Sequence, residues 1–197
     1  MSFVQPVPLA ARGVELAPLH VDHEAGLRTA AADGELWKLR TTAVPELKQT
    51  LAYIEGVLSG RQKGHRFAFA GRDQASGMLF GSTSFHDILL PVKHVEIGYN
   101  WYAARFLRPH INTTCKLLML SHAFNTLNCN VVGWRTDNFN FSSQAAIKRL
   151  GARKDGVTGG HALRRDGTIR DTVMCSLRVG ERPKVKAQLL HLLDKTR

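Results

Sequence analysis

The stretch from Val95 to Asn125 constrains the fold of this chain more than any other part of the sequence. It opens with four apolar residues at every second position: Val95, Ile97, Tyr99 and Trp101. Because side chains on a β-strand alternate between its two faces, this period of two predicts a strand with one buried face. Gly98 in the strand interior predicts a β-bulge or a close approach of a ligand to the backbone.

A short basic loop follows the strand and leads into an amphipathic helix. The loop contains Arg105, Arg108 and His110, and Asn112, Thr113 or Thr114 can cap the helix. Apolar residues then recur at every third or fourth position: Leu117, Leu120, Phe124 and Leu127. The first backbone N–H groups of a helix lack partners, and the helix dipole is positive at that end. The junction therefore predicts an anion-binding site.

Two blocks of residues make this chain resemble a known family. The first comprises Glu96-Ile97-Gly98-Tyr99 with Trp101, Asn112-Thr113 and Lys116, and the second comprises Thr136-Asp137, Asn140, Ser143, Ala145-Ala146-Ile147 and Leu150-Gly151-Ala152. In this order they resemble the core motifs of the GNAT acyltransferases, most closely the subgroup related to the Rim-type ribosomal-protein N-terminal acetyltransferases. Gly34-Glu35-Leu36-Trp37 and Arg170-Asp171-Thr172-Val173 fit the same subgroup, so the resemblance extends from Gly13 to Arg178.

The expected phosphate-binding loop departs from the family pattern. Family members usually have Gln or Arg, two residues, Gly, one residue, and then Gly or Ala, whereas the corresponding positions here are Leu107, His110 and Asn112. Pro109 also removes one backbone N–H from this loop. The sequence leaves two interpretations open: a weakened cofactor site, or a loop in which side chains replace one backbone donor.

The remaining residues predict alternating strands and helices. Strands are expected at residues 14–16, 67–70, 78–85, 131–135 and 172–177, with hairpin turns at 73–77 and 166–167. Helices are expected from Asp22 to Gly34, from Pro45 to Gly60 with Leu47, Leu51, Ile54 and Leu58 as its core face, from an Asn140 or Ser142 cap to Gly151, and over residues 185–193. This order predicts an α/β (α+β) fold with a mixed, mainly antiparallel sheet and helices on both faces. The resemblance adds a V-shaped splay between the two central strands, which admits the cofactor.

Composition limits the class of protein. With 197 residues the chain fits a single domain, expected to span residues 1–197, and no apolar run has the length of a membrane span. The amino terminus lacks the basic start and apolar stretch of a signal peptide, and the 3 cysteines indicate neither a disulfide framework nor a zinc site, so a reducing, cytoplasmic setting without a metal is expected. The formal net charge of +11 favours anionic partners, among them nucleotide phosphates, RNA and acidic proteins. No dense basic tract with interleaved aromatic residues is present, so nucleic-acid binding is not expected beyond an association with the ribosome.

The resemblance assigns the cofactor, acetyl-CoA, to two segments. The pyrophosphate is expected at the loop and helix start, and Asn140 and Ser143 match the pair that holds the pantetheine arm. A free backbone amide near Asn100 or Trp101 is expected to face the reacting carbonyl oxygen. The predicted cofactor-binding residues are Trp101, Leu107, Arg108, His110, Ile111, Asn112, Thr113, Asn140 and Ser143. For Asn140 and Ser143, simple helix capping is the alternative.

Transfer of an acyl group to an amine also requires a base. Glu96 is the leading candidate because it lies on the polar side of the central strand. An equally good interpretation is that Glu96 is simply a charged residue on an open sheet face. His86 and Asp87, at the end of the preceding strand, are second choices. Ser143 is expected, by resemblance, to donate a proton to the leaving thiolate. Trp37 and Tyr53 are candidates for the acceptor side or for the core.

These observations predict an N-acyltransferase that moves acetyl from acetyl-CoA to a primary amine by direct sequential transfer. The acceptor is a protein N-terminus or a small-molecule amine. The alternative is a non-catalytic basic module of the same fold that binds CoA or RNA. The sequence leaves the oligomeric state open, a homodimer included.

Overall fold

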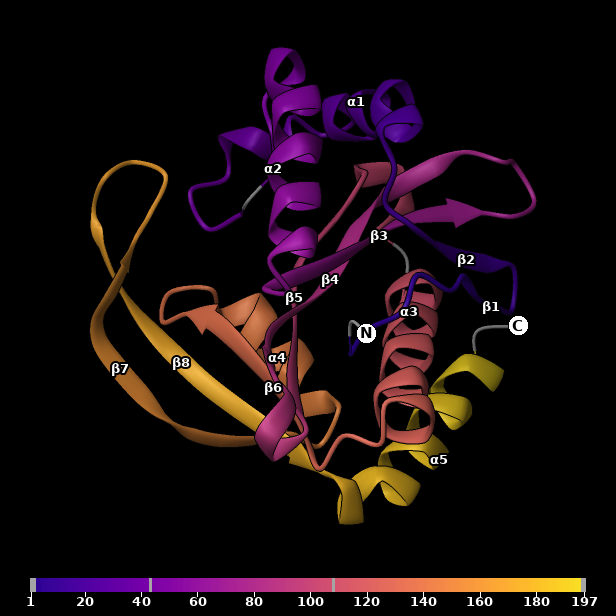
Figure 1. Ribbon diagram of the computed structural model, residues 1–197, viewed down its shortest axis with the longest axis vertical. Coiled ribbons are helices and arrows are strands. Elements are labelled where there is room, and N and C mark those ends of the chain that lie inside the picture. Colours follow the sequence, from indigo (N-terminus) through magenta and orange to yellow (C-terminus); the bar gives the residue numbers. More distant parts are fainter. Residues whose placement is uncertain (1–2, 43, 108, 196–197) are drawn as a thin grey trace.

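Eight strands within the described residues form one sheet at the centre of the molecule (Figure 1), and the computed structural model describes residues 3–42, 44–107 and 109–195. The strand order is β1-β2-β3-β4-β5-β6-β8-β7. The strands are β1 (Leu9–Ala11), β2 (Val14–Pro18), β3 (Arg66–Asp73), β4 (Leu79–Leu89), β5 (His94–Tyr102), β6 (Val131–Asp137), β7 (Arg153–Leu163) and β8 (Ile169–Arg178). The pairs formed by these strands are antiparallel, except that β5 and β6 run parallel. The predicted mixed, mainly antiparallel sheet is confirmed.

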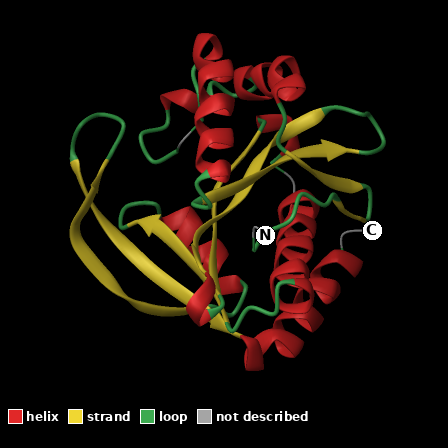
Figure 2. Cartoon of the chain, in the orientation of Figure 1, coloured by secondary structure: helices red, strands yellow, loops and turns green. Residues whose placement is uncertain are grey.

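Helices cover both faces of the sheet, as predicted (Figures 1 and 2). One face carries α1 (Glu24–Ala32) and α2 (Thr50–Gln62), and the other carries α3 (Pro109–Ser121), α4 (Phe141–Arg149) and α5 (Arg182–Asp194). A π-helical turn over His122–Thr126 continues α3, and short 3-10 turns precede α1 and α2. None of the helices formed by the described residues combines the length and hydropathy that a membrane span requires.

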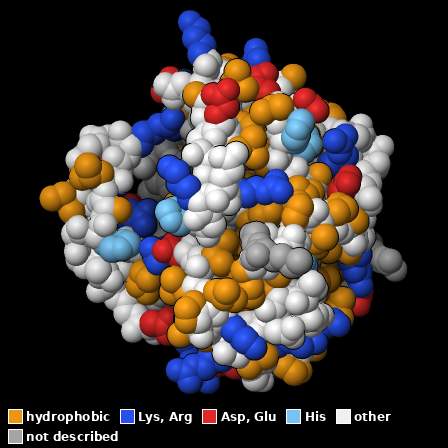
Figure 3. Space-filling model, in the orientation of Figure 1, with side chains coloured by type: hydrophobic (Ala, Val, Ile, Leu, Met, Phe, Trp, Pro, Cys, Tyr) orange, Lys and Arg blue, Asp and Glu red, His pale blue; other side chains and the backbone are white. Residues whose placement is uncertain are grey.

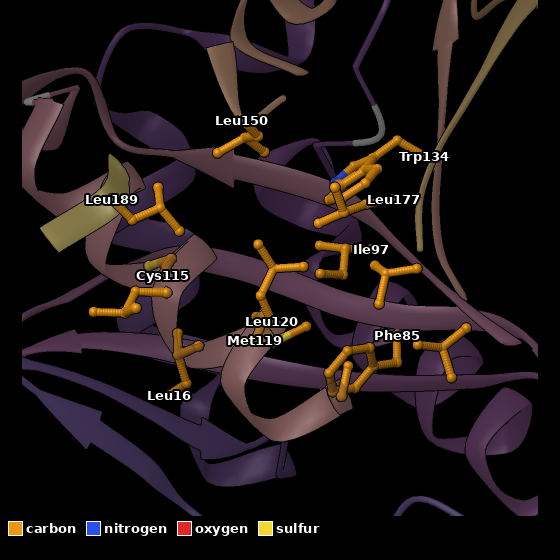
Figure 4. Close-up of a cluster of buried hydrophobic side chains, with 14 of the residues drawn as sticks. Leu16, Phe85, Ile97, Cys115, Met119, Leu120, Trp134, Leu150, Leu177 and Leu189 are labelled. Atoms are coloured by element: carbon orange, nitrogen blue, oxygen red, sulfur yellow. The ribbon is translucent and has the colours of Figure 1, made fainter. Parts of the chain in front are cut away.

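Two hydrophobic clusters hold these layers together. The larger lies between the sheet and α3, α4 and α5, and Figure 4 shows its centre, where Leu120 of α3 faces Ile97 of β5 and Trp134 and Leu177 lie beside them. The smaller lies under α1 and α2. Strand β3 contributes to both, since Phe67 and Phe69 face the larger cluster and Ala68 and Ala70 face the smaller one. Both faces of β3 are therefore apolar and buried.

The two central strands diverge after a short paired segment. β5 and β6 pair at His94↔Val131, Val95↔Val132 and Glu96↔Gly133, and no later residues of the two strands are paired. Beyond that point β5 continues to Tyr102 and β6 continues to Asp137. The predicted V-shaped splay is confirmed, and Glu96 lies at its apex.

The structure corrects the predicted course of α2. Pro45 precedes a 3-10 turn over Leu47–Gln49 and is not the first residue of the helix, which begins at Thr50. Ile54 is buried as expected, but Leu51 is 47% exposed and Gly60 lies inside the helix. The apolar spacing fails here because α2 buries the face that carries Thr50, Ile54 and Val57, and Leu51 is turned about 100° away from Thr50 around the helix.

Other boundaries agree with the prediction or extend it. Gly34 and Gly151 adopt left-handed φ angles just after α1 and α4, and both hairpins form with a left-handed glycine in the turn, Gly77 and Gly167. His20, rather than Asp22, caps the turn that leads into α1. Strand β1 has only three residues and no alternation long enough to reveal it in the sequence.

Candidate active site

A β-bulge in β5 marks the edge of the splay. Ser84 pairs with Gly98 and Ser82 pairs with Trp101, so two residues of β5, Tyr99 and Asn100, lie opposite the single residue between those serines. Tyr99 has a left-handed φ of 54°. The predicted bulge is confirmed, and it displaces Tyr99, which is 44% exposed, from the buried alternation that the sequence indicated.

Glu96 is buried, contrary to the expectation that it lies on an open polar face. Only 3% of the residue is exposed. Arg135 of β6 lies across the apex of the splay, and its Nε donates to Glu96 Oε1 at 3.0 Å and lies 2.9 Å from Oε2. The Nε2 atom of His94 is 3.7 Å from Oε1. Basic side chains, rather than water, therefore surround this carboxylate.

His86, from the neighbouring strand β4, completes the cluster. Its Nδ1 lies 2.7 Å from Asp87 Oδ2 and its Nε2 lies 4.0 Å from Glu96 Oε2. Burial lowers the pKa of His86, and this effect outweighs the opposing influence of the two nearby carboxylates. The imidazole is therefore neutral near pH 7 and has an unprotonated nitrogen that can accept a proton.

Asp87 orients His86 and also binds Arg135, whose Nη2 lies 3.0 Å from Asp87 Oδ1. Burial alone raises the pKa of Asp87, but the hydrogen bond with His86 and the charge of Arg135 lower it overall. Ligand atoms of His86, Asp87 and Glu96 all lie within 4.8 Å of one another, a spacing that the sequence did not predict and that a metal ion also accepts. The single charge of the Arg135 guanidinium offsets one of the two carboxylate charges, so the cluster keeps a net negative charge that favours holding a proton.

The anion site predicted at the start of α3 lies at a helix that begins earlier than expected. The helix starts at Pro109, so Asn112, Thr113 and Thr114 lie inside it and do not cap it. The backbone N–H groups of His110 and Ile111 thus belong to the first turn, where a helix supplies no acceptors. Pro109 at the first position removes an N–H that the helix does not use.

The side chains predicted to bind the cofactor near this turn lie in different environments. Leu107 is 63% exposed, Ile111 is buried in the larger core, and Asn112 and Thr113 are half-buried. His110 Nε2 lies 3.2 Å from the carbonyl oxygen of Arg12. Arg108 lies outside the described residues, and Arg105 pairs with Asp33 at 2.6 Å. Because the Ile111 side chain lies in the core, only the backbone of that residue can face a ligand. Contact between any of these residues and a cofactor stays a prediction.

Asn140 and Ser143 lie at the far end of the splay, where β6 leads into α4. The Asn140 side-chain oxygen accepts hydrogen bonds from the Ser143 backbone N–H at 3.1 Å and from the Ser142 hydroxyl at 2.9 Å. Asn140 is therefore the predicted cap of α4. Capping uses the side-chain oxygen and leaves the amide N–H₂ group to donate elsewhere.

Trp101 and Tyr53 lie on the face of the sheet that α1 and α2 cover. Trp101 is 4% exposed, packs in the smaller core, and directs its Nε1 toward the Tyr53 hydroxyl at 3.5 Å. The Trp101 side chain is thus a core residue, and only its backbone can face the splay. Trp37 is half-buried and its carbonyl oxygen accepts from Arg165 at 2.6 Å.

Tyr53 also lines a pocket of about 380 Å³ between α2 and the tip of the β7–β8 hairpin. The pocket includes Val44, Pro45 and Gln49 on one side and Leu163, Arg164 and Arg165 on the other. In Figure 3 the surface is hollowed between this hairpin and α2, and Lys, Arg and His side chains gather around the opening.

Sequence reasoning missed the structural importance of Arg66 and Arg135. Arg135 was expected only as the last residue of a strand, and Arg66 fell one position before one. The signal that could have found them was their position in the sheet. Arg66 pairs directly with His86 across the β3–β4 ladder and lies on the same sheet face, and Arg135 lies on the same sheet face as Glu96.

Known proteins share both this sequence pattern and this fold. Residues 14–153, more than half of the chain, match the family model described as an acetyltransferase (GNAT) domain. A GCN5-related N-acetyltransferase from Brucella melitensis is 26% identical, covers 96% of this chain and 86% of its own, and superimposes with a TM-score of 0.86. No curated protein matches the chain.

Rim-type enzymes are among the structural neighbours, as the resemblance predicted. RimJ from Mycobacterium smegmatis, solved in complex with CoA-disulfide, covers 94% of this chain and 92% of its own with a TM-score of 0.76 and 18% identity. A ribosomal-protein-S5-alanine acetyltransferase from Vibrio fischeri covers 87% and 96%, with a TM-score of 0.71 and 12% identity. At these identities the likeness concerns the fold. The splayed parallel pair, the bulge and the sequence match together show that the chain belongs to the GNAT acetyltransferase family.

Proposed function

We propose that this chain is an N-acetyltransferase that transfers the acetyl group of acetyl-CoA directly to a primary amine. The observation that carries the proposal is the apex of the splay, where β5 and β6 separate immediately after Glu96 and the bulge at Tyr99 follows three residues later. His86, with a neutral imidazole, lies at the same place. A gap between two strands, a disturbed ladder and a proton acceptor thus coincide.

The residues around the gap fit a CoA molecule. The backbone amides of His110 and Ile111, in the first turn, and the positive end of the α3 dipole suit a pyrophosphate. The amide N–H₂ of Asn140, which the capping contacts do not use, suits the carbonyl groups of a pantetheine arm. When bound, acetyl-CoA supplies a thioester that is already activated toward amines.

The cluster beneath the gap supplies the proton acceptor. We propose that His86 takes the proton of the incoming amine and that Glu96, whose Oε2 is 4.0 Å from the imidazole, stabilises the resulting positive charge. Asp87 fixes the ring through Nδ1. Glu96 as the direct base, the original prediction, is the alternative within this proposal, but the Arg135 guanidinium already occupies its carboxylate.

We further propose that the acceptor enters from the side of α2 and the β7–β8 hairpin. The pocket of about 380 Å³ between them is large enough for a few residues of peptide. The fold shared with ribosomal-protein acetyltransferases supports a protein N-terminus on the ribosome as the acceptor, with a small-molecule amine as the second candidate. The cysteines Cys115, Cys129 and Cys175 are free thiols, which fits a reducing cytoplasm.

Mass spectrometry tests this proposal directly. The purified protein is incubated with acetyl-CoA and with two libraries, one of peptides with free N-termini and one of small amines. A mass increase of one acetyl group on a member of either library, absent without protein, is the expected result. Binding of CoA with no product from either library would contradict the proposal and favour the non-catalytic module.

A further inference from the structure

Arg66 is held on the acceptor side of the sheet by neutral groups. Its Nε donates to the Ser84 hydroxyl at 3.0 Å and its Nη2 donates to the Tyr53 hydroxyl at 3.0 Å. The guanidinium carbon lies 3.8 Å from the centre of the Tyr99 ring. These contacts fix the position of the guanidinium, but none of them neutralises its charge.

Other arginines on this side of the molecule have their charge or their donors satisfied. Arg135 pairs with Glu96 and Asp87, Arg164 pairs with the buried Asp137, and Arg165 donates to two backbone carbonyl groups. In the part of the chain that the structure describes, no carboxylate pairs with Arg66. A guanidinium carries five N–H donors in a planar fork, so the contacts above leave donors for a carboxylate.

Arg66 also lies next to the proposed proton acceptor. Arg66 and His86 are direct partners across the β3–β4 ladder, and such pairs place their β-carbons about 5 Å apart on one face. Both side chains contact Tyr99, since the centres of the His86 and Tyr99 rings are 4.9 Å apart. An amine bound at His86 therefore lies about one side-chain length from the Arg66 guanidinium.

We propose that the acceptor of this enzyme carries a carboxylate close to its reactive amine and that Arg66 binds that carboxylate. An extended peptide advances about 3.5 Å per residue, so an Asp or Glu at the first or second position of a peptide N-terminus reaches Arg66 while the amine lies at His86. Tyr53 connects Arg66 to the pocket beside α2, which receives the following residues. The net charge of +11 draws acidic acceptors toward the site.

The inference rests on the proposed function, and binding and turnover test the two separately. The probes are peptide pairs that differ only by Asp against Asn at the first or second position, together with free alanine against alaninamide, which lacks the α-carboxylate. Calorimetry in the presence of CoA measures binding. Because hydrogen bonds to a charged group are strong when partly buried, the acidic member of a pair should bind about tenfold to a hundredfold more tightly.

Variants of Arg66 assign the preference to this residue. Arg66→Gln should remove the preference for the carboxylate, and Arg66→Lys, which keeps the charge without the planar fork, should retain part of it. Arg72→Gln is the matched control, because Arg72 lies at the other end of the same strand, 3.6 Å from Glu15, and should keep the full preference. Thermal melting confirms that each variant is folded.

Three results separate the outcomes. A preference for the carboxylate-bearing member in the peptide or the amino-acid arm that disappears in Arg66→Gln supports the inference, and the arm in which it occurs identifies the kind of acceptor. Equal binding of acidic and amide members in both arms, or a preference that survives Arg66→Gln, overturns it even if acetyl transfer is detected. An Arg66-dependent preference without any acetylated product supports the acidic ligand and contradicts the proposed function.

Discussion

The imidazole of His86 occupies the space that a side chain at Gly98 would need. A β-carbon at position 98 would lie far inside van der Waals contact with His86 Nε2, and also 2.9 Å from its Cδ2. Gly98 has no left-handed φ, so its backbone conformation does not require glycine. The glycine is needed because the proposed proton acceptor lies against the strand that forms one side of the splay.

Gly98→Ala should therefore displace His86 without unfolding the protein. A displacement of about 1 Å at a reacting group can reduce the rate by about a hundredfold, so we expect a decrease in kcat/KM of that order. Steady-state kinetics with the acceptor found by mass spectrometry measures it. Gly56→Ala in α2 is the control, because nothing lies within 4 Å of its added β-carbon and activity should be unchanged. Full activity of Gly98→Ala would show that His86 does not need its present position.

The pH dependence of kcat/KM distinguishes His86 from Glu96 as the base. Burial lowers the pKa of His86 from 6.5, so the acidic limb of the wild-type profile should lie below that pH. Activity is then lost as the pH falls, because the imidazole must be neutral to accept a proton. His86→Gln should lower kcat/KM by about a hundredfold or more and remove this limb. If Glu96→Gln removes the limb while His86→Gln keeps it, Glu96 is the base.

Asn140 can be tested for its two roles separately. Asn140→Ala removes the helix cap, which should cost about 1 kcal/mol of stability, and also removes the amide donor. Asn140→Asp keeps an oxygen that can cap α4 but lacks the N–H₂ group. We expect near-normal stability and weaker CoA binding for Asn140→Asp. Unchanged CoA affinity in both variants would leave Asn140 with a capping role alone.

Lys116 belongs to the motif that resembles the family, and its ammonium group is buried without a hydrogen-bond partner in the described residues. Burial lowers its pKa from 10.5 to about 8. At pH 7 the lysine is thus a buried charge that costs stability, and Lys116→Met should stabilise the fold by on the order of 2 kcal/mol.

The sign of the pH effect follows from the lowered pKa of Lys116. Between about pH 8 and pH 10.5 the unfolded chain keeps the proton that the folded chain has released, so the wild type gains stability as the pH rises through this range. The advantage of Lys116→Met, measured by denaturant unfolding, should therefore shrink from pH 8 to pH 10. A destabilised Lys116→Met at pH 7 would indicate that the ammonium makes a favourable contact.

Features of the fold were predictable from the sequence where they depend on local signals. The alternation from Val95 to Ile97, the hairpin turn ending at Gly77 and the glycine after α4 all depend on backbone preferences that are local in sequence. The start of α2 was not predictable in the same way. The helix begins after a 3-10 turn and buries Thr50, Ile54 and Val57, so Leu51 is exposed, and only tertiary packing selects that face.

The site was predictable in part. Glu96, His86 and Asp87 were recognised as ionisable residues near the central strands, and the structure brings them within 4.8 Å. Arg66 and Arg135 were not recognised, because their partners lie on other strands, and the Glu96–Arg135 pair joins residues 39 positions apart. Sequence patterns report which face a residue occupies, but strand order decides which charges meet there.

The most direct test of the account is calorimetric titration of the protein with CoA, in the wild type and in Asn112→Asp. An acidic residue in the first turn of α3 complements the helix dipole, so Asn112→Asp should melt at the same or a higher temperature than the wild type. The same charge repels a pyrophosphate, so the CoA affinity of Asn112→Asp should decrease by about tenfold or more. One CoA bound per chain in the wild type, with that opposite response of stability and affinity, is the predicted result. No heat of binding from folded wild-type protein, or equal affinity in Asn112→Asp, would contradict a phosphate site at the start of α3.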